Sequence, residues 1–218
     1  MIKIEKGAEP HEWLEYRVQP DATYEDADAE AKNALRNSLL LEQGYICGYC
    51  MRRIDAAHSR IEHIKPQSSS LAEGHPEEAL DYHNMILCCD GDINSAQEKK
   101  GFHCDRRKAD IPIHFSPLES HVVETVSYSS KSGEIKSSDE TYRNDFNDVL
   151  NLNHPRLKEN RLATLNGVID QLKKKSDWKK SELTDALNNY LCKNNEGKKK
   201  PYCGIVIWFL MKKIAQSK

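Results

Sequence analysis

The hydrophobic pattern is clearest near the start of the chain, where apolar residues recur every three or four positions between Ala27 and Leu40. This spacing places them on one stripe of an α-helix. Thr23, with Asp26 three residues later, is typical of a capping box at a helix start. Gly44 is a natural helix end, because glycine adopts the left-handed conformation without strain. We therefore predict a helix from Thr23 to Gly44 that leads directly into a cysteine-rich segment.

The chain outside residues 45–110 divides into three further parts. Residues 1–22 are predicted to be extended or irregular, because two prolines interrupt them. Residues 111–139 alternate apolar and polar positions before a glycine-containing turn, which favours a β-hairpin. From Asp139 onward the pattern is helical, and a last apolar helix is predicted to begin at about Cys203.

Residues 45–110 mix turn residues, cysteines and short apolar runs, and they carry no long helical period. This pattern favours a small motif held together by a metal rather than a large core. Short strands are predicted at 61–64 and 85–87, with a loop or a broken helix over 68–80 between them. A short helix is predicted to begin at Cys104.

The cysteines suggest a metal site. Cys47 and Cys50 are separated by two residues, the spacing that lets both sulfurs face one Zn²⁺, and Cys104 offers a third thiolate. Clustered cysteines without a secretion signal favour metal binding over disulfides. The alternative is that they are small buried apolar side chains. A closed four-ligand site would be structural rather than catalytic. The spacing leaves three candidates for the fourth ligand: Cys88, Cys89 and His103.

Glu62 and His63 form a neighbouring pair with hydrolytic potential. Glu62 offers a carboxylate suited to Mg²⁺, and His63, with an ordinary pKa of about 6.5, can accept a proton from water. Asp105, beside Cys104, is the best second carboxylate. A divalent ion held by Glu62 and Asp105 would bind a scissile phosphate and neutralise the leaving oxygen. The alternative, an ordinary exposed dipeptide, leaves the flanking cysteines unexplained.

Composition adds an expectation about the cell compartment. The chain has 38% hydrophobic and 30% charged residues, which is typical of a polar globular protein. Its most apolar window, residues 205–211, is far shorter than the roughly 20 residues that span a bilayer. No leading segment resembles a signal peptide. We therefore expect a cytoplasmic protein that does not bind membranes.

Charge is divided unevenly along the chain. Residues 1–150 hold 17 Lys and Arg against 28 Asp and Glu, whereas residues 151–218 hold 15 against 6. A basic region behind an acidic one favours binding to a polyanion or to an acidic partner surface, although a solvated lysine-rich helix face gives the same pattern. A second basic run follows Cys104 and consists of Arg106, Arg107 and Lys108. These residues could contact the phosphates of nucleic acid, or could equally form a solvated helix face.

Together these motifs resemble the HNH endonucleases, or ββα-metal nucleases. The resemblance rests on the two-residue cysteine spacing, on Glu62 to Pro66, on Asn84 to Cys89 and on Cys104 to Lys108. It implies that His63 is the general base, that Glu62 is a metal ligand and that Asn84 braces the loop behind the base. It also favours Cys89 as the fourth zinc ligand, since the family has a cysteine five residues after the asparagine. Asp105 takes the last metal-ligand position, where histidine is common.

Segments outside the motif are similar to one subfamily, the retron-associated and Septu-type anti-phage HNH proteins. These segments are 1–6, 40–44 and 150–153, with Leu157 and Arg161 beyond them. The resemblance implies a bacterial defence nuclease that acts beside an ABC-type ATPase, and in some members beside a reverse transcriptase with its RNA–DNA product.

We therefore expect an α+β, mainly α fold with three parts: an N-terminal arm and helix (1–44), an HNH core stapled by a four-cysteine zinc site (45–115), and a hairpin followed by a basic helical region (116–218). The expected activity is hydrolysis of phosphodiester bonds with Mg²⁺ or Mn²⁺. DNA and tRNA both remain open as substrates. Two alternatives use the same cysteines: a non-catalytic zinc-binding docking module and a stand-alone HNH restriction-type DNase.

Overall fold

A computed structural model describes residues 1–91, 101–174 and 178–217. The helices are α1 (His11–Arg17), α2 (Ala29–Gln43), α3 (Gln67–Ala72), α4 (Asp105–Lys108), α5 (Ser120–Glu124), α6 (Glu140–Asn144), α7 (Pro155–Lys173), α8 (Lys180–Leu191) and α9 (Cys203–Gln216). Shorter turns are the 3₁₀ helices η1 (Pro76–Leu80) and η2 (Tyr82–Asn84) and the π-helical turn η4 (Asp145–Val149). The strands are β1 (Arg60–His63), β2 (Met85–Cys88), β3 (Val126–Tyr128) and β4 (Ile135–Ser137).

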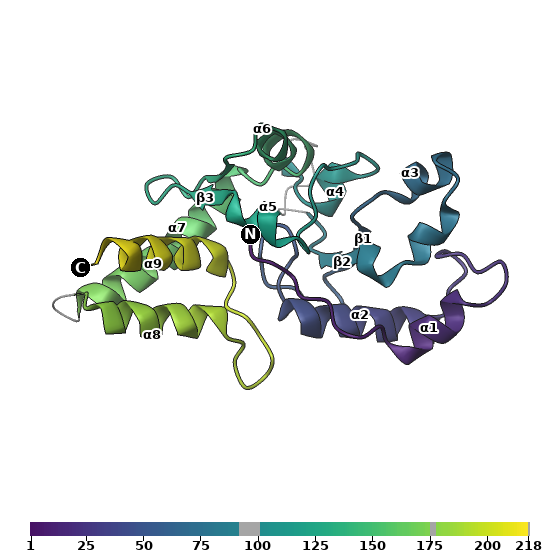
Figure 1. Cartoon of the computed structure of the whole chain (residues 1–218), viewed down its shortest axis with the longest axis horizontal. Helices are drawn as coiled ribbons and strands as arrows, with labels where there is room; N and C mark the ends of the chain where they lie inside the picture. Colours follow the sequence, from purple (N-terminus) through teal and green to yellow (C-terminus); the bar gives the residue numbers. More distant parts are fainter. Residues whose placement is uncertain (92–100, 175–177, 218) are drawn as a thin grey trace.

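The molecule is elongated, with α8 and α9 at one end and α1 and α3 at the other (Figure 1). Within the described ranges the strands pair as two antiparallel two-stranded sheets, β1 with β2 and β3 with β4. Helices make up most of the regular structure. The expected mixed fold with predominant helix is therefore confirmed at this level.

Helix α2 packs against strand β2 of the first sheet. Its start is set by Asp28, whose side chain accepts a hydrogen bond from the Ala31 amide at 2.8 Å. Thr23 and Asp26 do bond to each other, but they do so in a separate turn, so the predicted helix start at Thr23 was too early. Gly44 ends the helix in the left-handed conformation at φ 63°, as predicted.

The N-terminal segment departs from its prediction. Helix α1 lies within residues 1–22, which were expected to be irregular. Its stability comes from tertiary contact rather than from a long apolar stripe. Trp13 is fully buried, and its indole Nε1 donates to the carbonyl of Leu80 at 3.2 Å. The helix therefore forms because one aromatic side chain docks on a distant segment.

The first sheet is short, and its register fixes the site. Glu62 pairs with Ile86, and His63 pairs with Met85. The side chain of Gln43 extends the hydrogen bonding of the sheet, because it accepts from the amide of Leu87 and donates to the carbonyl of the same residue. The sheet is thereby attached to the end of α2, just before the chain reaches the cysteines.

The β3–β4 hairpin was predicted, although the preceding valines form α5 instead of strand. Gly133 lies in its turn with φ 69°, and a Cβ there would meet the carbonyl oxygen of Lys158 at 2.2 Å. Arg161 of α7 is buried and donates to the carbonyls of Gly133 and Leu152. This arginine thus ties the hairpin to the helical region.

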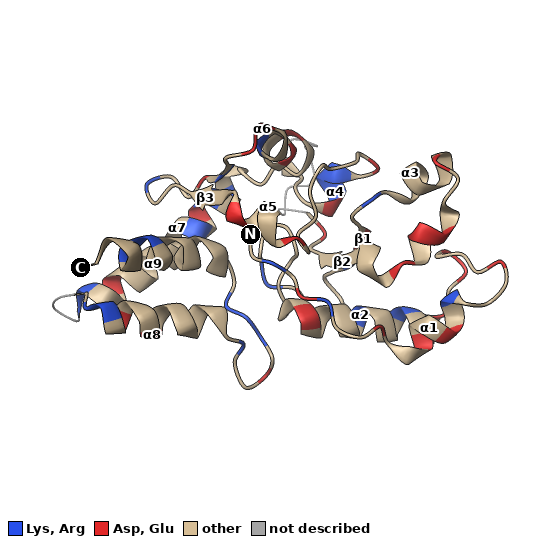
Figure 2. Ribbon diagram, in the orientation of Figure 1, with Lys and Arg blue, Asp and Glu red and all other residues tan. Residues whose placement is uncertain are grey.

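The C-terminal helices are integral to the protein. Ile205, Val206 and Leu210 of α9 are fully buried in the common hydrophobic core. Lys and Arg gather on the connection between α8 and α9 (Figure 2). Several of these lysines bond to backbone carbonyls; Lys199, for example, donates to Leu191 O at the end of α8. Among the described helices, none is both long and apolar enough to cross a lipid bilayer.

Candidate functional site

Four cysteine sulfurs converge in the interior. Cys47 and Cys50 come from the turn after α2, Cys89 follows β2, and Cys104 immediately precedes α4. Their ligand atoms all lie within 4.8 Å of one another, and all four side chains are buried. The Cys47–Cys104 and Cys50–Cys89 sulfur pairs are each 3.8 Å apart. The four residues favoured on sequence grounds are therefore brought together.

This geometry fits a tetrahedral Zn²⁺. Zinc–sulfur bonds of about 2.3 Å in a tetrahedron require sulfurs roughly 3.8 Å apart, which matches the two measured pairs. Burial also raises the pKa of the Cys104 thiol well above its ordinary value. A buried set of four thiolates therefore needs a cation to offset its charge.

The two other candidates for the fourth ligand lie outside this set. Cys88 is the last residue of β2, and its neighbour Cys89 supplies the converging sulfur. His103 lies beside the cluster, with its Nδ1 3.1 Å from the sulfur of Cys104 and 3.8 Å from that of Cys89. Its amide donates to the carbonyl of Gly91, which closes the base of the long insertion between the two cysteines. Most of that insertion, residues 92–100, lies outside the described residues.

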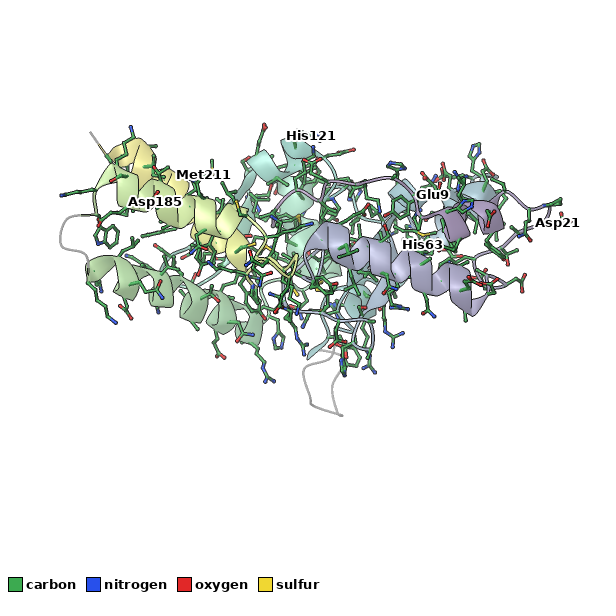
Figure 3. All side chains as sticks on the ribbon, turned by 90° about the horizontal axis from the view of Figure 1, so that it is seen from below. Glu9, Asp21, His63, His121, Asp185 and Met211 are labelled. Atoms are coloured by element: carbon green, nitrogen blue, oxygen red, sulfur yellow. The ribbon has the colours of Figure 1, made fainter. Side chains whose placement is uncertain are left out.

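His63 is the last residue of β1 and lies in the same half of the molecule as Glu9 and Asp21 (Figure 3). Its Nε2 lies 2.9 Å from the carbonyl oxygen of Ala79. A carbonyl can only accept, so Nε2 carries the proton and Nδ1 keeps a lone pair. Burial lowers the pKa of His63 below its ordinary value, and its imidazole is therefore neutral at pH 7. On the other side of the ring, the side-chain amide nitrogen of Gln67 lies 3.5 Å from Nδ1.

Glu62 is buried beside a cation. Only 5% of the residue is exposed, and its Oε1 lies 2.7 Å from the ammonium of Lys108. The hydroxyl of Tyr49 donates to the same oxygen at 3.3 Å, and Asp105 is within hydrogen-bonding reach. Burial raises the pKa of Glu62 to about 8, despite the opposing effect of Lys108. A further positive charge close to this buried carboxyl would lower its pKa and stabilise its ionised form.

Lys108 differs from its expected position. It was predicted to present its charge to nucleic acid along with Arg106 and Arg107, but only 1% of it is exposed. Its ammonium also donates to the carbonyl of His63 at 3.1 Å, so it holds the end of β1. Arg106 and Arg107 are exposed, so their predicted contact with phosphate stays a prediction.

Asp105 completes the acidic side of the site. It is the first residue of α4 and lies 3.7 Å from the guanidinium of Arg60. Glu62, His63, Asp105 and Lys108 all line one open cleft of about 360 Å³. The structure therefore brings the predicted base and both predicted carboxylates into a single cavity.

Asn84 links the strand of the base to the strand that follows. Its Oδ1 accepts from the amide of Lys65 at 2.8 Å, and its Nδ2 donates to the carbonyl of the same residue at 3.0 Å. Its own carbonyl accepts from the amide of Ile64. These bonds fix the chain just after His63, which is the geometry that a bracing role requires.

Several residues of the site were not identified from the sequence. Tyr24 packs its ring edge-on against the imidazole of His63, with centroids 4.7 Å apart. Gln67, Ala79 and Tyr49 contact His63 or Glu62 as described above. None of these residues forms a spacing motif with the base, and only the position of Tyr49 between two paired cysteines could have drawn attention to it.

Comparison with known proteins gives one informative similarity. No protein-family model matches the chain. The chain is 26% identical over 147 residues to the protein named "Retron Vc95 putative HNH endonuclease" from Vibrio cholerae serotype O1 biovar El Tor. The aligned part covers 65% of this chain and 68% of that protein. This distant similarity supports the resemblance to HNH endonucleases.

Proposed function

We propose that this chain is a metal-dependent HNH endonuclease that hydrolyses phosphodiester bonds of nucleic acid. In this proposal β1, β2 and α4 form its ββα-metal unit. The observation that carries the proposal is the single cleft that His63, with its neutral imidazole, lines together with the carboxylates of Glu62 and Asp105. The distant similarity to a retron HNH protein supports the same reaction.

The protein's own groups would act as follows. His63 Nδ1 takes a proton from the attacking water, while the Nε2–Ala79 bond keeps the ring in place and in the required tautomer. Asn84 holds the following backbone, so the ring cannot swing away with the loop. Glu62 and Asp105 would hold one Mg²⁺ or Mn²⁺, which neutralises charge on the phosphate and its leaving oxygen. Arg106 and Arg107 would attract the phosphate backbone to the cleft.

In the same proposal the cysteine cluster holds Zn²⁺ for structure alone. Four thiolates leave no open coordination position, so a zinc ion held by four cysteines neither activates water nor binds substrate. The ligands would be the converging cysteines: Cys47, Cys50, Cys89 and Cys104. The protein would thus hold two different metal ions: a structural zinc on cysteine sulfurs and a catalytic Mg²⁺ or Mn²⁺ on carboxylate oxygens.

The similarity to a retron protein also favours a biological setting. We propose an effector nuclease of a bacterial anti-phage system, working in the cytoplasm beside an ABC-type ATPase and, in a retron, beside a reverse transcriptase with its RNA–DNA product. The basic region 151–218 is the proposed contact with the ATPase, because its charge suits an acidic partner surface. Co-purification tests this: Lys180→Glu with Lys212→Glu should reduce capture of the ATPase, whereas Lys131→Glu with Lys136→Glu should not. Equal capture by both pairs would count against the proposed surface.

The activity itself is tested with the zinc-loaded protein, plasmid DNA and total tRNA in the presence of Mg²⁺. His63→Ala should lower the cleavage rate by about 10²–10⁴-fold, which is the usual contribution of a general base. His83→Ala is the matched control, since His83 is an exposed histidine near the same strands. Both variants should stay folded with unchanged zinc content, although His63→Ala should melt at a lower temperature because it loses the ring contact with Tyr24. Wild-type protein that binds zinc but cleaves neither substrate would instead favour the non-catalytic docking module.

A further inference from the structure

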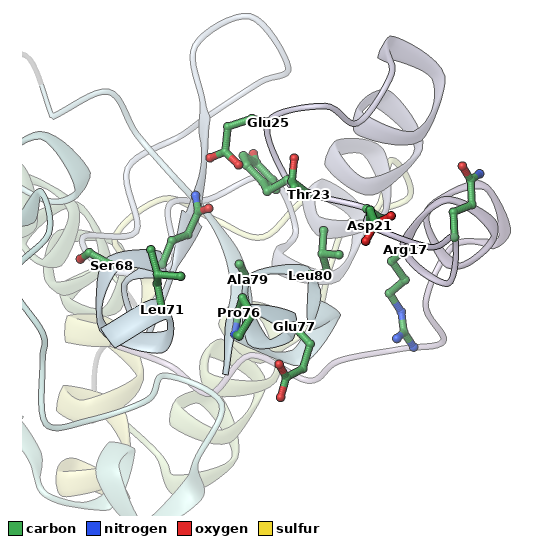
Figure 4. Close-up of a pocket in the computed structure, with 14 residues that line it drawn as sticks. Arg17, Asp21, Thr23, Glu25, Ser68, Leu71, Pro76, Glu77, Ala79 and Leu80 are labelled. Atoms are coloured by element: carbon green, nitrogen blue, oxygen red, sulfur yellow. The ribbon is translucent and has the colours of Figure 1, made fainter. Parts of the chain in front are cut away.

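A second cavity lies beside His63 and shares the lining residue Gln67 with the cleft that holds Glu62, His63 and Asp105, here called the metal cleft. It has a volume of about 600 Å³. One wall is the irregular segment 21–25, and the other is formed by α3 and η1. Figure 4 shows these two walls, with Thr23 and Glu25 on one side and Leu71, Pro76 and Ala79 on the other. A volume of this size is typical of a site for a small organic group rather than of a packing defect.

The cavity shares its boundary with the proposed base. Tyr24 and Ala79 line it, and both touch His63: the tyrosine ring lies against the imidazole, and the alanine carbonyl accepts from Nε2. Gln67 lines both this cavity and the metal cleft. A chain whose phosphate lies in the metal cleft would therefore have its adjacent nucleotide at the mouth of this second cavity.

The lining is suited to an uncharged ring and unsuited to a phosphate. Its apolar part includes Leu71, which is 68% exposed and therefore contributes little to folding. Asp21, Glu25 and Glu77 supply carboxylates around it. The one cationic side chain among the described lining residues, Arg17, is paired with Glu9, whose carboxylate lies 2.9 Å from its Nη2. Carboxylates repel phosphate but accept hydrogen bonds from amino groups.

The neighbouring cleft is suited to a phosphate in a different way. Arg106 and Lys108 line it beside three carboxylates, two of which, Glu62 and Asp105, would hold the divalent ion of the proposed function. The two cavities would thus divide a nucleotide by chemistry: basic side chains and a bound divalent cation for the phosphate, and apolar surface with hydrogen-bond acceptors for the base. A paired base could not enter, because its amino edge is engaged in pairing and its faces are stacked.

We propose that the cavity binds an unpaired nucleobase with an exocyclic amino group, from the nucleotide next to the scissile phosphate. The substrate would then be single-stranded or locally unpaired nucleic acid, and not regular duplex. This inference rests on the proposed nuclease function, since it uses His63 to place the phosphate. It adds a substrate class that the motif chemistry leaves open.

Binding without added divalent metal tests the inference separately from cleavage. The probes are fluorescein-labelled dC12, dU12, and dC12 annealed to dG12, measured by anisotropy with the full zinc-loaded chain. Cytosine and uracil differ at the pairing edge by an amino group against a carbonyl. The wild type should bind dC12 about tenfold more tightly than either dU12 or the duplex, the effect of one good hydrogen bond to a charged acceptor.

Two variants and two controls locate the effect. Leu71→Ala and Glu77→Gln should each reduce the dC12 preference at least threefold. Leu41→Ala, which removes a leucine that is 53% exposed on α2, and Glu12→Gln on α1 should leave it intact. Equal affinity for the three probes, or equal loss in the control variants, would overturn the proposed base site. Preferential binding without any Mg²⁺-dependent cleavage would instead sink the nuclease proposal and leave the base site standing.

Discussion

The cysteine cluster and the carboxylate–histidine cleft are both built from residues 45–110, yet they differ in almost every physical respect. The four sulfurs are sealed in the core, whereas the cleft is open to solvent. The cluster consists of like ligands at nearly equal spacing, and the cleft combines acids, a neutral base and a buried lysine. One arrangement suits a metal that is never released, and the other suits a metal that must exchange contacts with a substrate.

The two regions are nevertheless joined residue by residue. Tyr49 lies between Cys47 and Cys50, and its hydroxyl donates to Glu62. Asp105 directly follows Cys104. Glu62 is thus bonded to a residue between two cysteines, and Asp105 is itself next to a cysteine, so the cluster supplies the rigid support that precise catalytic geometry requires.

This comparison predicts its largest effect for loss of a cluster cysteine. Cys104→Ser should abolish zinc binding and unfold the region around the cluster, because structural zinc contributes about 10–16 kcal/mol, as much as the whole stability of a typical domain. Zinc content by mass spectrometry and thermal unfolding by circular dichroism would measure this. Cys192→Ser is the control, since Cys192 is an exposed thiol remote from the cluster in sequence. A folded, zinc-free Cys104→Ser protein would refute the structural role.

The cleft should respond differently to loss of its buried cation. Lys108→Met removes the partner of Glu62 and the bond to His63 O. We expect a loss of about 2 kcal/mol, as for a hydrogen bond to a charged group. The roughly 3–5 kcal/mol that follows when a buried ion is left unpaired should not appear, because the pKa of Glu62, which burial already raises to about 8, should rise further without Lys108 and leave the carboxyl neutral.

Denaturant unfolding measures the Lys108→Met effect, and zinc content should stay at the wild-type value. Arg107→Met provides a matched control on the same short helix, since Arg107 is exposed. If Lys108→Met lost zinc as well as stability, the cleft and the cluster could not be treated as separate regions.

Asn84 should have an intermediate effect on catalysis. Asn84→Ala removes both side-chain bonds to the backbone of Lys65, so the segment after His63 becomes free to shift. We expect about 1–3 kcal/mol of lost stability and a reduction in kcat that exceeds the change in KM. Steady-state kinetics would separate the two constants. A change in KM alone would indicate that the asparagine binds substrate rather than bracing the base.

Those features of the two regions that depend on local spacing could be predicted from the sequence. Helix α2, strands β1 and β2 and the four converging cysteines each have a local signal, whether a helical period, a short apolar run or a family spacing. Helix α1 was missed because it depends on Trp13 reaching Leu80, a contact between distant positions. The burial of Lys108 was missed for the same reason: its sequence neighbours are exposed arginines, and only the packing of α4 against β1 makes it an internal cation.

The smallest predicted effect concerns the bond that joins the two regions. Tyr49→Phe keeps the buried ring and removes only the hydroxyl that donates to Glu62. At 3.3 Å this bond is long, so we expect a stability loss near the lower end of the usual range, about 0.5–1 kcal/mol, and a less than tenfold decrease in cleavage. Zinc content should not change, since the ring still fills the turn between the cysteines. Denaturant unfolding and cleavage rates, measured on the same preparations, would test this expectation. A decrease in activity of 10²-fold or more with normal stability would mean that the Tyr49 hydroxyl alters the chemistry of the Glu62 carboxyl. The cluster would then be more than a rigid support.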